Sequence, residues 1–468
     1  MEHNNQQKLG LGQILAFANG KFAEAIVQNT IQILALPIYS IGLGVNPSLI
    51  GLAISVPRLW DAFTDTFAGY ISDNYRSKYG RRKPFMVLGI ILAGLLYLLL
   101  WSPPVGMGDM LTFVYFLVVS LMFYTAATLY LVPYYALGNE LTSDPQQRTK
   151  LMTYCAVFIS VAGLLTPWAY KLSFMPYFGS NEIEGVRVVG VIGASLLVAA
   201  GLLPCIFCKE KAEAQRQPKF DFYDAFVSTF KCRPFVIMCS VYILGLFGIL
   251  LVAPMAFYVG TFYMFDGDKA AMSTLYGWLG CIWAFTSIIC SPVIYRLINR
   301  YERKYVLIWS LVLVMIGQGI QWWMFTPKYP YLSIISYVLS SPGVAALHII
   351  VYSWLADICD YDCLRSGLRR EGTFSAIYGL VVKTAFAIAI FFSGVLISIA
   401  GVSAGGGEIP SAESILRLRV LFSTVPPVVI MITIAIAFRY PLTKAKMRDV
   451  QQQLELRNNQ KAGGSIND

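Results

Sequence analysis

The chain has 468 residues, of which 57% are hydrophobic and only 13% are charged, whereas soluble domains carry about 25% charged residues. This composition excludes an ordinary soluble domain and indicates a polytopic membrane protein. The formal net charge is +10, and its placement along the chain points to membrane topology rather than to binding of nucleic acid or an acidic substrate.

Apolar segments of about 20 residues can cross a hydrocarbon core of about 30 Å. Twelve such segments are predicted, at about 11–40, 48–72, 84–103, 111–138, 150–172, 186–208, 234–263, 270–295, 305–326, 331–356, 373–401 and 416–438. Lys and Arg concentrate in the connections after even-numbered segments, which predicts that these connections and both termini are cytoplasmic. We expect a multi-pass protein of the plasma membrane (the inner membrane of a bacterium), with no cleavable signal peptide.

The longest basic connection separates six segments from six. The expected organisation is an N-terminal six-helix bundle (1–208), a cytoplasmic linker (209–233), a C-terminal six-helix bundle (234–440) and a cytoplasmic tail (441–468) that forms a short amphipathic helix. Twelve transmembrane helices in two bundles, an all-α fold, are an architecture of transporters, whose substrate site lies near the bilayer midplane.

The second segment carries Arg58, Asp61 and Asp65, which are three and four residues apart and therefore share one face of a helix. Each charge in a lipid-facing helix would cost about 2.5–3.5 kcal/mol. The stripe must therefore face protein or a water-filled cavity, and we interpret it as part of an ion or substrate pathway. Static ion pairs that hold helices together are the alternative.

Other charges lie in the first and eleventh segments. Lys21, Glu24 and Gln28 repeat every three or four residues in the first segment, and Lys383 lies in the eleventh. The spacing suggests three ion pairs: Lys21 with Glu24, Arg58 with Asp61 and, across the bundle, Asp65 with Lys383.

The connection after the second segment reads Gly69-Tyr-Ile-Ser-Asp73-Asn-Tyr-Arg76-Ser-Lys78-Tyr-Gly80-Arg81-Arg82-Lys83-Pro84. It resembles the Gly-x-x-x-Asp…Gly-Arg-Arg loop of the major facilitator superfamily, in the lengthened form of the glycoside–pentoside–hexuronide:cation symporter (melibiose-permease-like) family. Three further stretches resemble that family: Trp60-Asp61-Ala-x-x-x-Asp65, Val132-Pro-Tyr-Tyr-Ala-Leu-x-x-Glu140, and Ala356-Asp357-x-x-Asp360-Tyr361 with Arg369-Arg370-Glu371-Gly372.

The resemblance implies a conformational clasp, in which charged residues at helix ends latch neighbouring helices in one of two states. The residues expected in it are Asp73, Arg81, Arg82, Asp360 and Arg370. A merely solvated basic loop is the alternative.

The resemblance also implies a cation site made by Asp61, Asp65 and Thr128, with Lys383 and Arg58 as coupling residues. Two carboxylates and a hydroxyl supply the oxygen ligands and the charge that a hard cation needs. The coupling ion is Na⁺ or H⁺, and no other cofactor or metal is expected.

The sugar-binding residues of that family match less well. Its two sugar-gripping acids align with Phe22 and Leu131, and its arginine aligns with Ala156. Aromatic rings beside hydrogen-bonding groups suit sugars, although any one ring is also explained by packing. The candidate substrate-binding residues are Lys21, Glu24, Gln28, Tyr124, Tyr154, His348, Tyr352 and Tyr378.

These observations predict a cation-coupled secondary symporter that imports a glycoside or related sugar derivative by alternating access, as a monomer in the bilayer. The alternatives are a transporter of a lysophospholipid-like amphiphile and a non-transporting sensor on the same scaffold. An enzyme is not expected, because no Ser/His/Asp set, metal cluster or phosphate loop appears. Among nine cysteines, Cys205-x-x-Cys208 has the spacing of half a metal or redox motif, and we interpret it as packing.

Overall fold

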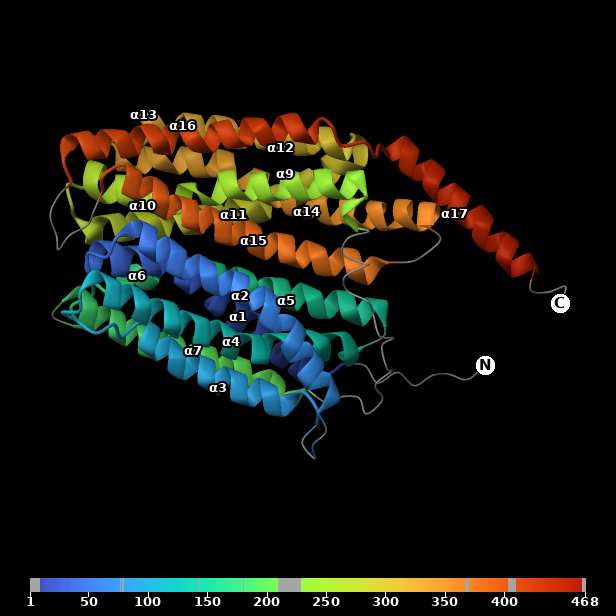
Figure 1. Ribbon diagram of the computed structural model, residues 1–468, viewed down its shortest axis with the longest axis horizontal. Helices are drawn as coiled ribbons and strands as arrows, with labels where there is room; N and C mark the ends of the chain where they lie inside the picture. The colour runs from blue at the N-terminus through green and yellow to red at the C-terminus, as the bar shows by residue number, and fades with distance from the viewer. Residues whose placement is uncertain are drawn as a thin grey trace. The chain divides into compact units, whose positions relative to one another are not determined.

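The computed structural model describes residues 9–464 except 76, 78, 79, 143, 180, 209–228, 367–369 and 403–409. The regular elements of this described part are all helices (Figure 1). Contacts divide the chain into two units: unit 1 comprises Met1–Arg216, Pro254–Ala284 and Ile390–Leu418, and unit 2 comprises Gln217–Ala253, Phe285–Ala389 and Arg419–Asp468. Most of the expected linker lies outside the described residues, so the predicted division into two bundles and a linker stays a prediction.

Ten helices in the described part are long and apolar enough to cross a membrane. The two other expected segments are also helical, as α2 (Pro47–Asn74) and as α12 (Arg303–Gly319) with α13 (Gln321–Met324). Helix α2 carries the three charges of the predicted stripe, and α12 is interrupted after 17 residues. The charges make α2 less apolar, and the interruption leaves α12 shorter than a membrane span, although both segments are helical.

Unit 1 holds the N-terminal helices. They are α1 (Leu11–Ala35), α2, α3 (Lys83–Leu100), α4 (Asp109–Leu141), α5 (Pro145–Leu165), the short α6 (Ala169–Leu172) and α7 (Glu182–Phe207). A π-helical turn η1 (Leu36–Gly42) follows α1 and contains Pro37, whose missing N–H interrupts the regular ladder. A 3₁₀ turn η2 (Thr166–Trp168) joins α5 to α6.

Helix α4 packs against both α2 and α3, and α1 packs against α5 and α7. The approach of α3 to α4 requires a glycine, because a Cβ added at Gly89 would lie 2.7 Å from the backbone nitrogen of Tyr130. Unit 1 also includes most of α10 (Val252–Val259), the π-helical turn η3 (Gly260–Met264) and the first part of α11 (Lys269–Arg300). These contacts fix the faces of α1, α2 and α4 that carry the polar residues.

Unit 2 contains α9 (Arg233–Leu250), the end of α11, α12, α13, η4 (Pro330–Leu332), α14 (Ser333–Ser366), most of α15 (Glu371–Ile399), most of α16 (Ala412–Ala437) and α17 (Lys444–Gly464). Helix α14 packs against α9, α12 and α17. It continues past the expected end at 356 to Ser366, so the predicted motif around Asp357 is helical. The tail predicted to form an amphipathic helix is α17, which buries Met447 and Val450.

Candidate cation and substrate site

The charged side chains of α2 face the interior of unit 1. Arg58 and Asp61 are only 4% and 5% exposed, whereas Phe63 and Phe67 on other faces of the helix are 65% and 68% exposed. Asp65 is half-buried. This is the orientation that the cost of charge in lipid predicts.

Oxygen atoms from α2 and α4 meet at Asp61. The Thr128 hydroxyl, 1% exposed, donates a hydrogen bond to Asp61 Oδ1. Thr64 Oγ1 lies 3.4 Å from Thr128 Oγ1 and donates to the Asp61 backbone carbonyl at 3.2 Å. A hydroxyl that donates one bond keeps two lone pairs, so this cluster offers oxygen ligands to a cation. Thr64 was not predicted, although it lies three residues after Asp61 and so shares its face.

Arg58 is held by α1 and α4. Its guanidinium donates to the side-chain oxygen of Gln28 and, at 3.0 Å, to the Gln28 backbone carbonyl. Its Cζ lies 4.9 Å from the centre of the buried Tyr124 ring, a cation–π arrangement. Arg58, Gln28 and Tyr124 therefore form one group, which sequence spacing did not indicate because the three lie on different helices.

The polar stripe of α1 contains the predicted local ion pair. Lys21 Nζ lies 2.6 Å from Glu24 Oε2, and each side chain is 19% exposed. Lys21 also lies over the Tyr135 ring of α4, 4.4 Å from its centre. Tyr154, on α5, is half-buried. Lys21 and Glu24 thus form a partly accessible charged pair bordered by an aromatic ring, which suits a polar ligand.

In unit 2, α9, α14 and α15 bring three predicted substrate residues together around Tyr242. His348 Nδ1 lies 3.2 Å from the Tyr242 hydroxyl. The Tyr378 ring packs edge-on against Tyr242 and Tyr352, with centroids 5.2 Å apart in both pairs. Tyr378 is buried and Tyr352 is exposed. Tyr242 was not predicted, because it lies in an apolar run with no charge or repeat to mark it.

Lys383, also on α15, is half-buried. It belongs to unit 2 and Asp65 to unit 1, so their pairing stays a prediction.

The loop arginines of the predicted clasp converge on Glu140 at the end of α4. Arg81 contacts one carboxylate oxygen of Glu140, and Arg82 Nη1 lies 2.8 Å from the other. Arg82 is 6% exposed. The Asp73 side chain lies outside the described part of the structure. Glu140 stands in one of the motifs quoted above, but its pairing with the arginines depends on the packing of α4.

Of the other predicted clasp residues, Asp360 lies near the end of α14 and Arg370 lies just before the start of α15. Arg370 Nη2 lies 2.7 Å from Asp362 Oδ1, and its Nε donates to Asp362 Oδ2 at 2.9 Å. Asp360 lines a cavity of about 300 Å³ with Tyr352. A second ion pair joins Arg303 to Asp357. Asp362 and Arg303 were not predicted as partners.

A further charge cluster joins distant segments of unit 1. Glu182, the first residue of α7, accepts a hydrogen bond from the Tyr170 hydroxyl at 2.5 Å and lies 3.0 Å from Lys269 Nζ. Lys269 also donates to the Ile41 carbonyl at 3.2 Å. This cluster, Glu182 with Tyr170 and Lys269, ties α6, α7 and η1 to the start of α11. The sequence signal was weak, since each charge stands alone at a segment end.

The Cys205-x-x-Cys208 motif is buried. Cys208 Sγ lies 3.8 Å from the Gln13 carbonyl, and burial raises the pKa of the Cys208 thiol to about 11. Across the described residues, no cluster of three or more His, Cys, Asp or Glu side chains is arranged to hold a metal. The motif's contacts are those of packed side chains.

Ten described helices long enough to span a bilayer, with a carboxylate–hydroxyl cluster where one of them, α4, meets the charged helix α2, are features of a multi-pass membrane transporter. The chain belongs to the MFS/sugar transport protein family, whose model matches residues 16–444. This match confirms the family and the fold that the sequence motifs predicted.

Relatives and solved structures agree with this assignment. The chain is 24% identical over 459 residues to the putative glycoside/cation symporter YagG of Escherichia coli (strain K12), covering 94% of each chain. It is 22% identical over 457 residues to the sodium-dependent lysophosphatidylcholine symporter 1 of Gallus gallus, covering 88% of this chain and 82% of that one. A bacterial homologue of the human lysosomal transporter Spinster superposes with a TM-score of 0.68 at 16% identity, covering 94% of this chain and 97% of that one. The all-α major facilitator fold is confirmed.

Proposed function

We propose that the protein is a secondary symporter that couples the import of a glycoside or related sugar derivative to Na⁺ or H⁺ by alternating access. The observation that carries the proposal is the buried Asp61 carboxylate with the Thr128 hydroxyl bonded to it. A buried intramembrane carboxylate is costly to keep and is usually functional. The symporter names of relatives over nearly the whole chain support the coupling.

In this mechanism, Asp61, Asp65 and Thr128 hold the cation and Thr64 adds a hydroxyl. Arg58 is fixed by Gln28 and Tyr124 next to the cation site, so it compensates carboxylate charge while the site is empty. The Lys21–Glu24 pair on α1 and, considered separately, the rings around Tyr378 in unit 2 are the substrate contacts that we propose within each unit. Cation binding then changes the free energy of closure, which is what coupling requires.

The test is uptake of a radiolabelled glycoside panel into proteoliposomes, with Na⁺ and pH gradients imposed separately. We expect accumulation driven by one of the two gradients. Asp61→Asn should abolish accumulation and retain exchange of substrate, whereas Asp109→Asn, at the exposed start of α4, should behave as the wild type. An Asp61→Asn protein that still concentrates substrate would contradict the proposal.

A second candidate is transport of an amphiphile such as a lysophospholipid. It is supported by an apolar cavity of about 630 Å³ between α2, α3 and α4, lined mainly by Leu side chains and by Trp60. Trp60 precedes Asp61 and donates to Thr125 at 3.0 Å. Lysophosphatidylcholine in the same proteoliposome assay distinguishes the candidates: its gradient-driven uptake, without uptake of any glycoside, would favour this one.

A further inference from the structure

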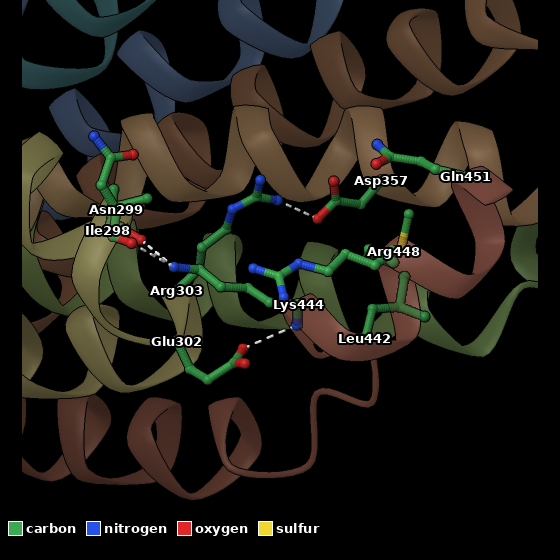
Figure 2. A pocket seen from close by; sticks show the side chains of 10 residues that line it. Ile298, Asn299, Glu302, Arg303, Asp357, Leu442, Lys444, Arg448 and Gln451 are labelled. Atoms are coloured by element: carbon green, nitrogen blue, oxygen red, sulfur yellow. Dashed lines mark hydrogen bonds and ion pairs between the residues drawn. The ribbon is translucent and has the colours of Figure 1, made fainter.

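A polar cavity of about 260 Å³ lies in unit 2, where the end of α11, the start of α12, α14 and the first turns of α17 meet (Figure 2). It is separate from the proposed transport residues. Five charged side chains line it: Glu302, Arg303, Asp357, Lys444 and Arg448.

Both carboxylates of this cavity are already engaged. Asp357 forms an ion pair with Arg303, and Glu302 accepts the backbone N–H of Lys444 at 3.0 Å. The Lys444 ammonium donates to the carbonyls of Ile298 and Asn299, at 2.5 Å and 3.2 Å, and so satisfies two carbonyls in the last turn of α11. These bonds hold α17 onto the turn between α11 and α12.

Arg448 differs from the other four charged residues. Its side chain is exposed and points into the cavity from α17 (Figure 2). Among the described residues its side chain forms no hydrogen bond and no ion pair, whereas each of the other four forms at least one. With three cations and two carboxylates, the lining carries one net positive charge, and the N-terminal end of α17 adds a partial positive charge.

We propose that this cavity binds a phosphate group, carried by an anionic lipid or by a free phosphate compound. An arginine guanidinium presents a planar fork of donors that matches phosphate, and the volume equals that of about eight or nine waters. The cavity lies just beyond the end of α16 at Ala437, and basic pockets beside membrane-spanning helices bind anionic headgroups. Phosphate bound to Arg448 and Lys444 would fix α17 against α12 and α14.

The test measures binding to the purified full chain in detergent by isothermal titration. The probes are inorganic phosphate, short-chain phosphatidic acid, and phosphatidylcholine with the same acyl chains. We expect phosphatidic acid or phosphate to bind, and phosphatidylcholine to bind at least tenfold more weakly. Binding of phosphatidic acid alone assigns the site to a lipid headgroup, and equal binding of inorganic phosphate assigns it to the free anion. The proposal would be overturned if neither phosphatidic acid nor inorganic phosphate binds, or if phosphatidylcholine binds as tightly as phosphatidic acid.

Variants locate the site. Arg448→Gln removes the guanidinium but leaves the Lys444 and Arg303 bonds that hold α17, so it should fold and bind the probe at least tenfold more weakly. Arg448→Lys should recover part of the affinity. Arg457→Gln, further along α17 and outside the cavity, is the matched control and should bind as the wild type. Unchanged affinity in Arg448→Gln would refute the assignment.

Discussion

Asp61 and Thr128 are 67 residues apart in the sequence, yet the family resemblance predicted that they belong to one site. Local spacing was enough for the Lys21–Glu24 pair, because residues three apart face each other on any helix. Local spacing could not predict Gln28 as the acceptor for Arg58, because that hydrogen bond depends on how α1 packs against α2. The roles of these residues in cation and substrate binding stay predictions.

Thr128→Val should weaken cation binding by about tenfold or more, because the change removes a hydroxyl ligand and a bond to a charged acceptor worth about 1.5–3 kcal/mol. Thr128→Ser should retain most of the affinity. The measurement is the cation dependence of substrate exchange in proteoliposomes. Thr112→Val, on the same helix with its hydroxyl bonded to Gly108, is the control; an equal loss there would show a general effect on α4.

Glu24→Gln should weaken substrate binding by about 1.5–3 kcal/mol, the value of a charge-assisted hydrogen bond. Cation affinity measured without substrate should hardly change, because Glu24 pairs with Lys21 rather than with Asp61 or Thr128 in the described contacts. Titration of purified protein with cation alone and with substrate separates the two effects. A larger change in cation affinity than in substrate affinity would refute the assignment to the substrate site.

Cys208 should react slowly with iodoacetamide at neutral pH. Its thiol pKa is raised to about 11 by burial, and the thiolate is the reactive form. Its thiolate fraction is therefore about one in a thousand at pH 8 and rises tenfold with each pH unit toward 11. Peptide mass spectrometry of folded and denatured protein checks this. Equal labelling of both at pH 8 would show an accessible, activated thiol instead.

At the scale of elements, apolar length predicted the helices well and their ends less well. Helix α14 runs to Ser366, past the expected end at 356, and its charged residues Asp357 and Asp362 there form ion pairs with Arg303 and Arg370. The π-helical turn after α1 also escaped prediction. Helix ends and π-helical turns depend on contacts with other helices, whereas hydropathy describes only the composition of a single segment.

The Glu182 cluster should act as a latch between α7 and α11. Lys269→Met removes one partner of the ion pair and should raise the labelling rate of Cys281, which accepts a hydrogen bond from Trp168 Nε1 at 3.2 Å. We expect about a five- to tenfold increase, equivalent to about 1–1.4 kcal/mol of closure free energy. The measurement is peptide mass spectrometry after timed maleimide exposure.

Lys328→Met serves as the control for the latch, because Lys328 is exposed and lies over the Tyr329 ring. Its labelling profile should match that of the wild type. A Cys281 rate that Lys269→Met leaves unchanged would mean that the ion pair does not limit opening.

At the scale of the whole molecule, the family and the all-α fold follow from the motifs and composition, while the substrate does not. The residues with which relatives of the resembled family hold sugar align here with Phe22, Leu131 and Ala156. Ligand identity depends on a few side chains within a shared scaffold, so neither hydropathy nor fold resolves it. The cytoplasmic placement of both termini rests on Lys/Arg bias and remains a proposal.

Lys383 should influence cation binding in unit 1 if the two units are coupled. Lys383→Ala should shift cation affinity by about tenfold or change the preference between Na⁺ and H⁺, because the family resemblance predicts that the Lys383 charge competes with the cation. Uptake measured against Na⁺ concentration at pH 6 and pH 8 reveals either effect. Lys304→Ala, at the start of α12, is the control, and identical profiles for both variants would exclude a role in coupling.

Helix α4 carries Thr128 and Glu140 on a single continuous rod of 33 residues. The two positions are about 18 Å apart along the axis at 1.5 Å per residue, and Pro133 between them removes one rung of the backbone ladder. We therefore expect a tilt of α4 at the candidate cation site to displace the Glu140 carboxylate that pairs with Arg81 and Arg82. A cation that binds at Asp61 and Thr128 would then change, through one helix, the contact of the loop arginines with Glu140.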